Sequence, residues 1–183
     1  MKELSLHILD IVQNAISAEA KEVDIQVLED ERSNEMVIRV ADDGRGMSPE
    51  VAQKALDPYH TSRTTRRVGM GLPLFRHTAE QAGGHLEIRS EVGKGTTVEA
   101  RMVYDHVDRP ELGDMAGVLS LVIGSNPQLR FRYHHRYNEK EYLLDTREVN
   151  EALEGTPISD PGILRYIREM IRENIRTITS TNK

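Results

Sequence analysis

The sequence predicts an α+β two-layer sandwich, in which a mostly antiparallel sheet is covered by helices on one side. Four segments alternate apolar and polar residues, as half-buried strands do, at residues 22–28, 36–40, 85–90 and 97–103. Polar turns join them into two antiparallel hairpins. Two further segments are predicted as helices: the first repeats apolar residues every three or four positions, and the second follows a glycine turn, has Pro73 near its first turn and ends at a glycine stop. The first covers residues 3–20, and the second begins near Gly71 and ends at Gly83-Gly84.

Composition narrows the function classes. The chain has 183 residues with 38% hydrophobic residues, enough for a core, and a formal net charge of -6. That charge argues against a general nucleic-acid binder. The absence of Cys excludes disulfides and thiolate metal sites. No apolar run approaches the roughly 20 residues that span a bilayer, and the first residues lack the apolar region of a signal peptide. We therefore expect a cytoplasmic protein that acts without a membrane.

The first predicted helix carries two stripes. Leu4, Ile8, Ile11, Val12 and Ala15 form the apolar stripe, and His7, Asp10, Asn14 and Ser17 form a polar one. A polar stripe is either a solvated face or a functional one. Asp and Asn are poor helix formers in mid-helix, where a solvated face would more naturally carry Glu, Lys or Gln. The pair Asp10 and Asn14 therefore favours the functional alternative.

A glycine-containing loop follows the second strand, in the stretch Val40-Ala41-Asp42-Asp43-Gly44-Arg45-Gly46-Met47. Asp42 would lie at the floor of a pocket, with acceptor oxygens for an amino group such as that of a purine. Gly44 and Gly46 would let the backbone turn sharply and let a flat ligand approach it. An ordinary Asp/Gly turn remains the alternative. The pattern does not match a calcium loop.

A polar, basic segment without periodicity follows at residues 58–68, and Arg63, Arg66 and Arg67 lie in it. It is either an exposed loop or a lid over a polyanion. The turn Gly69-Met70-Gly71-Leu72 then leads into a helix, and such a turn offers free N–H groups to phosphate. No Gly-Lys-Ser/Thr follows, so the turn is not a Walker A loop.

The C-terminal part, residues 105–183, is predicted as a small α+β extension after a polar boundary at residues 105–113. Val118 to Ile123 is apolar and strand-like, and residues 129–134 alternate. A turn at Asn138-Glu139 leads to a further strand. A final helix begins at Ser159-Asp160-Pro161, and its apolar stripe packs against its own domain or a partner. His134 and His135 point to opposite faces of a strand, which argues against a metal site.

The motifs together resemble the GHKL ATPases, the superfamily of DNA gyrase, the ninety-kilodalton heat-shock chaperone, histidine kinases and MutL-type mismatch-repair proteins. They stand in the order Asp10 with Asn14, Asp42-x-Gly44-x-Gly46, the basic segment, Gly69-x-Gly71-Leu72 and Gly93-Lys94-Gly95-Thr96. Residues 14–25 are most similar to the mismatch-repair proteins, whereas residues 56–63 and 84–88 are more similar to histidine kinases. The resemblance covers residues 3–104 and implies a Bergerat-type ATP-binding domain over residues 1–104.

The resemblance also implies roles. Asp42 would accept from the adenine amino group, helped by Thr96, with Gly44, Gly46 and Met47 lining the nucleotide. Asn14 would bind Mg²⁺, and Asp10 would be the catalytic residue. The turn formed by Gly69, Met70, Gly71 and Leu72 would hold phosphate oxygens, and Arg63 would reach the terminal phosphate from the lid. Asp10 departs from the family, because hydrolysing members carry Glu there and histidine kinases usually carry Asn.

Three functions follow from the resemblance. The first is an ATP-driven switch with slow hydrolysis that acts on a protein partner. The second is a protein kinase acting in trans, of the anti-sigma-factor type or a detached histidine-kinase catalytic domain. The third is a nucleotide sensor without catalysis. We expect a protein partner or phosphoacceptor and allow for a homodimer, with residues 105–183 serving association rather than chemistry.

Overall fold

The computed structural model describes residues 2–59 and 71–180. Within them, six strands form one sheet in the order β3-β4-β2-β1-β5-β6. The strands are β1 (Glu22–Asp30), β2 (Glu35–Asp42), β3 (His85–Glu91), β4 (Gly95–Val103), β5 (Arg130–Tyr137) and β6 (Lys140–Asp145). The helices are α1 (Leu4–Ser17), α2 (Pro49–Ala55), α3 (Gly71–Gln81), α4 (Met115–Ser125), α5 (Thr146–Ala152) and α6 (Pro161–Thr179).

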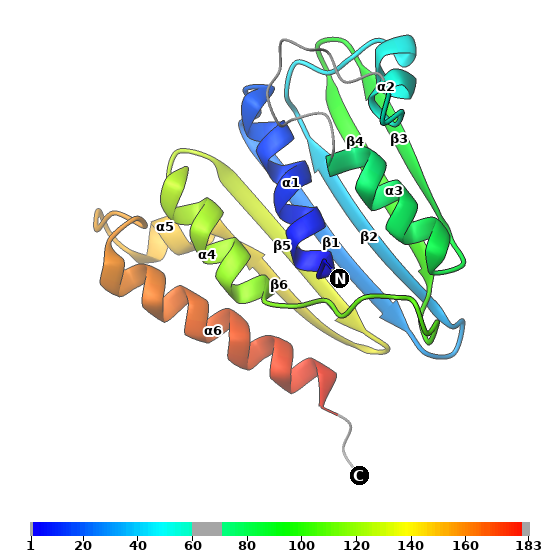
Figure 1. Cartoon of the computed structure of the whole chain (residues 1–183). Helices are drawn as coiled ribbons and strands as arrows, with labels where there is room; N and C mark the ends of the chain where they lie inside the picture. The colour runs from blue at the N-terminus through cyan, green and yellow to red at the C-terminus, as the bar shows by residue number, and fades with distance from the viewer. Residues whose placement is uncertain (1, 60–70, 181–183) are drawn as a thin grey trace.

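Neighbouring strands are antiparallel except at one junction. The hairpins β1–β2, β3–β4 and β5–β6 confirm the three predicted turns. The exception is β1 with β5, which pair in parallel with Val23 opposite Phe131. The strands after residue 105 thus extend the same sheet as the strands before it. Figure 1 shows this continuous sheet, with β5 beside β1 and β6 beyond β5.

The core lies between the sheet and a layer of helices, and this confirms the predicted two-layer α+β sandwich. Figure 1 shows α1, α3, α4 and α6 across one face of the sheet. The inward side chains of β1 are fully buried, among them Val23, Ile25 and Val27. The intervening side chains of β1 lie on the opposite, polar face, as the period of two requires.

The stretch from Val118 to Ile123 is helical, so its prediction as a strand was wrong. It belongs to α4, whose N-cap Asp114 accepts the Gly117 N–H at 2.9 Å. The helix lies between α1 and α6 in Figure 1 and packs on both, which explains its high apolar content. A short apolar run does not distinguish a buried strand from a buried helix by periodicity alone.

The predictions for the final helix are confirmed. Asp160 caps α6 by accepting the N–H groups of Gly162 and Ile163, and Pro161 begins the helix. Its apolar stripe, with Ile167 and Ile171 buried, packs on α4, β5 and β6 of the same chain. The apolar stripe of α6 is therefore packed against its own chain.

The two neighbouring histidines diverge as predicted. The ring of His134 lies 2.8 Å from Glu141 on the polar face. His135 is fully buried, with Glu29 at 2.7 Å and the Tyr133 hydroxyl at 2.9 Å. Within the described residues, no cluster of His, Cys, Asp and Glu could hold a metal ion.

The segment that joins β4 to α4 caps the first helix. The carbonyls of Glu111 and Leu112 accept the N–H groups of Leu4 at 3.0 Å and Ser5 at 2.8 Å. These are N–H groups that a first helical turn leaves without partners, and the N-cap Glu3 makes no side-chain cap. The beginning of α1 is thus fixed by a distant part of the chain.

No helix in residues 2–59 and 71–180 is both long and apolar enough to cross a membrane.

Candidate functional site

Asp42 ends β2 and presents a half-buried carboxylate beside the glycine loop. Its Oδ1 accepts the backbone N–H of Gly44 at 2.8 Å, and the backbone of Thr96 also donates to the carboxylate. Burial nevertheless raises the pKa of Asp42 above its ordinary value, since it outweighs these donors. The Asp42 carboxylate is thus held in place as an acceptor. Its burial is unfavourable, and an additional hydrogen-bond donor would offset part of that cost.

The glycines of this loop are required by contacts within the chain. A Cβ at Gly44 would lie 2.8 Å from the Ala18 carbonyl at the end of α1. Gly46 has φ of +68° and a Cβ there would lie 2.0 Å from the Glu91 carbonyl. A side chain at either place would displace the loop, and this explains the Gly-x-Gly spacing.

Ser90 connects the loop to the β3–β4 turn. Its Oγ accepts the Met47 N–H at 2.7 Å and lies 3.1 Å from the Gly95 carbonyl and 2.8 Å from the Thr96 Oγ1. A hydroxyl donates one hydrogen, so Ser90 donates to Gly95 while the Thr96 hydroxyl donates to Ser90. Sequence reasoning missed Ser90; its polar side chain just before a glycine-rich turn was the available signal.

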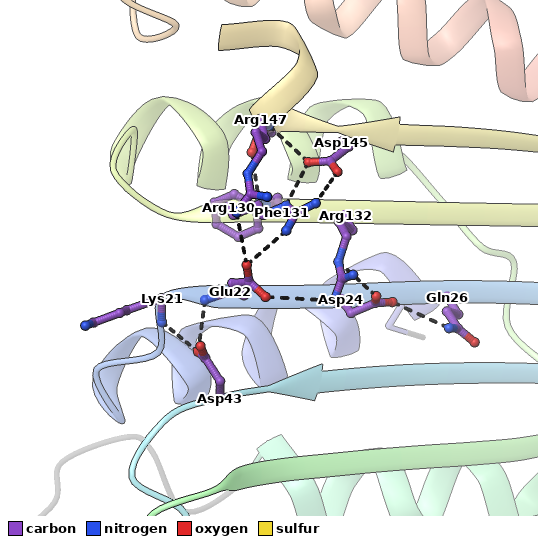
Figure 2. Close-up of polar contacts among 11 residues, drawn as sticks. Lys21, Glu22, Asp24, Gln26, Asp43, Arg130, Phe131, Arg132, Asp145 and Arg147 are labelled. Carbon is purple, nitrogen blue, oxygen red and sulfur yellow. Dashed lines mark hydrogen bonds and ion pairs between the residues drawn. The ribbon is translucent and has the colours of Figure 1, made fainter. Parts of the chain in front are cut away.

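Asp43 anchors the other side of the loop (Figure 2). Its Oδ1 accepts the N–H groups of Lys21 at 2.7 Å and Glu22 at 2.9 Å. The Glu22 carboxylate in turn binds Arg130 of β5 at 3.0 Å, and Arg130 also binds Asp145 of β6 at 2.6 Å. A continuous polar network therefore joins the residue next to Asp42 to the C-terminal strands.

Asp10 and Asn14 lie on α1, half-exposed and one helical turn apart. Asp10 contacts the first residue of α3, because a Cβ at Gly71 would lie 3.0 Å from the Asp10 Cβ. Its Oδ2 accepts from the Lys2 ammonium at 2.6 Å. The carboxylate thus lies at the positive end of α3, beside a cation.

His7 is 1% exposed, so it does not share the accessible polar face expected for it. Its ring stacks on Phe75 of α3 at a centroid distance of 4.9 Å, and Nε2 lies 3.1 Å from the Thr78 hydroxyl. Burial, followed by repulsion from Lys2, lowers the pKa of His7 to about 4. At neutral pH the neutral ring is a packing element between α1 and α3.

The predicted site residues fall into two groups on the described part of the chain. Asp42, Gly44, Gly46, Met47 and Thr96 come together around the loop after β2. Asp10 of α1 and Gly71 of α3 are in contact, while Asn14 follows Asp10 by one turn of α1 and Leu72, next to Gly71, is buried. Arg63, Gly69 and Met70 lie outside the described residues, as does most of the predicted lid.

Comparison with solved structures shows the same fold. The Aquifex aeolicus MutL ATPase domain complexed with ADP has a TM-score of 0.53 and 16% identity, over 100% of this chain and 99% of that one. The N-terminal domain of a DNA repair protein has a TM-score of 0.55 and 15% identity, over 99% of this chain and 58% of that one. Both alignments include the C-terminal strands and helices.

Sequence comparison places the first part of the chain in a family. The sensor protein SrrB of Staphylococcus aureus is 30% identical over 102 residues, which make up 53% of this chain and 18% of that protein. The chain therefore spans less than a fifth of this relative. The family model described as "Histidine kinase-, DNA gyrase B-, and HSP90-like ATPase" matches residues 2–106. The chain belongs to this family of histidine kinase-, DNA gyrase B- and HSP90-like ATPases, as its motifs predicted.

Proposed function

We propose that the protein binds Mg²⁺-ATP between the loop after β2 and the beginning of α3, and hydrolyses it slowly as a switch that regulates a protein partner. The observation that carries this proposal is the placement of two carboxylates on the ATPase domain. Asp42 lies in the glycine loop, and Asp10 contacts the first residue of α3. The adenine end of a nucleotide carries an amino donor that Asp42 would accept, and its negatively charged phosphates would face the beginning of α3.

The adenine end is supported by the chemistry of Asp42. Two backbone donors hold its carboxylate in place, and burial raises its pKa. An exocyclic amino group would supply the further donor that a half-buried carboxylate favours. Thr96 would assist through its hydroxyl, which Ser90 positions.

The phosphate end has groups of the right kind for Mg²⁺ and phosphate. Asn14 offers an amide oxygen, which is the hard ligand type that Mg²⁺ takes, and Asp10 lies one helical turn away. These side chains fit the metal, which when bound would neutralise charge on the phosphates. The turn before Leu72 would donate N–H groups to phosphate, and Arg63 would reach the terminal phosphate.

Asp10 would perform the proton chemistry. A carboxylate beside the phosphates can orient a water molecule for attack and accept its proton. Asp is one methylene shorter than Glu, so the reach toward that water is reduced and hydrolysis should be slow. Slow intrinsic turnover suits a switch that waits for its partner.

A site that consumes ATP would operate where ATP is abundant, and we therefore propose that the protein acts in the cytoplasm.

A second function, phosphorylation of a partner in trans, is supported by the 30% identity with the sensor protein SrrB. In that case Asp10 would accept the proton of a hydroxyl on the partner, or the acceptor would be a histidine. A nucleotide sensor without catalysis is the third alternative.

ATP labelled at the γ-phosphate separates these functions. The purified protein would be incubated with labelled ATP and Mg²⁺, with and without a fraction of cell lysate. Release of free labelled phosphate supports the switch, whereas label on a lysate protein supports the kinase. Binding of ATP with neither outcome supports the sensor, and absence of any binding contradicts all three.

A further inference from the structure

Lys2 makes a specific contact with the candidate catalytic carboxylate. Its Nζ lies 2.6 Å from the Asp10 Oδ2, and the side chains of Lys2 and Asp10 are 38% and 30% exposed. An ammonium group has three N–H donors, and toward the described residues Lys2 uses one of them, in its contact with Asp10. An ion pair this accessible contributes little to stability, so its position suggests a different role.

The position of Lys2 is held by the fold. The residues that follow it, Leu4 and Ser5, donate their N–H groups to Glu111 and Leu112 in the segment between β4 and α4. Glu3 is in contact with the same segment, since a Cβ at Gly113 would lie 2.2 Å from its Oε2. The backbone directly after Lys2 is thus held by the segment between β4 and α4.

Among the described residues, His7 also interacts electrostatically with Lys2 and Asp10, and it does not supply positive charge. His7 faces both Lys2 and Asp10, and its pKa of about 4 keeps the ring neutral at physiological pH. Lys2 therefore provides a cation at this end of the described site, next to the positive end of α3. Terminal phosphate oxygens require such a cation as the bond to ADP breaks.

We propose that Lys2 is a catalytic residue whose ammonium group binds the terminal phosphate of ATP while it also holds Asp10. This inference rests on the proposed nucleotide site. In the hydrolytic step a water oxygen forms a bond to the γ-phosphorus and the bond from that phosphorus to the ADP oxygen breaks. Asp10 takes the proton of the water, and Lys2 keeps its own proton and neutralises charge on the phosphoryl oxygens.

Equilibrium binding tests this role without reference to turnover. We would measure the affinity of the full chain for ADP and for a non-hydrolysable ATP analogue, with Mg²⁺, by titration calorimetry. Lys2→Gln should weaken binding of the analogue about tenfold to a hundredfold, the range for a hydrogen bond to a charged group. ADP lacks the terminal phosphate, so its affinity should change by no more than about twofold, because charges at longer range are screened.

Two further variants make the result specific. Lys2→Arg keeps the charge and should retain most of the discrimination between the analogue and ADP. Arg176→Gln removes a cation from an exposed ion pair on α6, where it lies 2.9 Å from Glu173, and should leave both affinities unchanged. If Lys2→Gln changes neither affinity, or lowers both equally, Lys2 does not bind the terminal phosphate and the inference is wrong. If the unmodified protein binds neither nucleotide, the proposed function fails together with it.

Discussion

Gly71 and Asp10 are in contact across the interface between α3 and α1. A Cβ on Gly71 would lie 3.0 Å from the Asp10 Cβ and 3.6 Å from its Oδ2. The absence of a side chain at Gly71 therefore allows the candidate catalytic carboxylate to lie against the first turn of α3. The N–H groups of a first helical turn generally have no helical partners, and they favour negative charge nearby.

The first prediction follows from this contact. Gly71→Ala should displace Asp10 by a few tenths of an ångström or more, and turnover of ATP should fall by roughly tenfold, since misplacements near 1 Å cost about a hundredfold. Binding at the adenine end should be affected less. Gly162→Ala, in the first turn of α6, adds the same methyl group near Asp160 and far from the site, and should leave turnover unchanged. Equal turnover in both variants would show that the contact has no catalytic consequence.

The second prediction concerns adjacent carboxylates with different roles. Asp42→Asn replaces an acceptor with a group that can present donors to the adenine amino group, so ATP affinity should fall about tenfold to a hundredfold. Asp43→Asn is the matched control, because an amide oxygen can still accept the N–H groups of Lys21 and Glu22. Calorimetric titration of both variants should show a loss for Asp42→Asn alone. An unchanged affinity in Asp42→Asn would contradict its role with adenine.

The third prediction is a pH dependence of stability that comes from His7. Folding lowers the pKa of His7 from 6.5 to about 4, so the unfolded chain binds more protons in this interval. Stability from this group is complete above pH 6.5 and decreases toward pH 4, by up to about 3 kcal/mol. His7→Phe, which keeps a ring against Phe75, should remove this part of the pH dependence. Chemical denaturation of both proteins between these pH values checks it, and parallel curves would contradict the assignment.

Much of the architecture could be predicted because it depends on local periodicity. Buried and half-exposed side chains alternate regularly along β1, as the sequence pattern predicts. The cap Asp160 and Pro161 marked the beginning of α6 correctly, since both act within one helical turn. The loop after β2 followed from the spacing of Asp42, Gly44 and Gly46, which the backbone contacts now explain.

What could not be predicted depends on contacts between distant parts of the chain. Helix α4 is apolar because α1 and α6 cover it, and periodicity alone does not reveal such burial. His7 was placed on an accessible face, yet α3 covers it. The pairing of β1 with β5 in parallel joins segments about a hundred residues apart, and no local pattern encodes it. No local pattern points to Lys2, since only the fold brings its ammonium group to Asp10.

The last prediction concerns Asp10, which decides between a catalytic site and a passive one. The contact with Gly71 and the ion pair with Lys2 place its carboxylate beside the first residue of α3, where we propose that the phosphates bind. Asp is shorter than Glu by one C–C bond, roughly 1.5 Å, and a displacement of about 1 Å can cost on the order of a hundredfold in rate. Asp10→Asn should therefore bind ATP nearly as well as the unmodified protein but lose turnover, whereas Asp10→Glu should hydrolyse ATP as fast or faster.

Parallel measurements of binding and turnover separate Asp10 from its neighbour on the helix. Asn14→Ala should weaken Mg²⁺-dependent ATP binding as well as turnover, because Asn14 is the proposed metal ligand. Asp10→Asn should lose turnover but keep ATP binding. An amide cannot accept a proton from the attacking water or from a partner's hydroxyl. The assignment is wrong if Asp10→Asn leaves both hydrolysis and partner phosphorylation intact while Asn14→Ala abolishes them. In that case Asp10 is an ordinary half-exposed residue of α1, paired with Lys2.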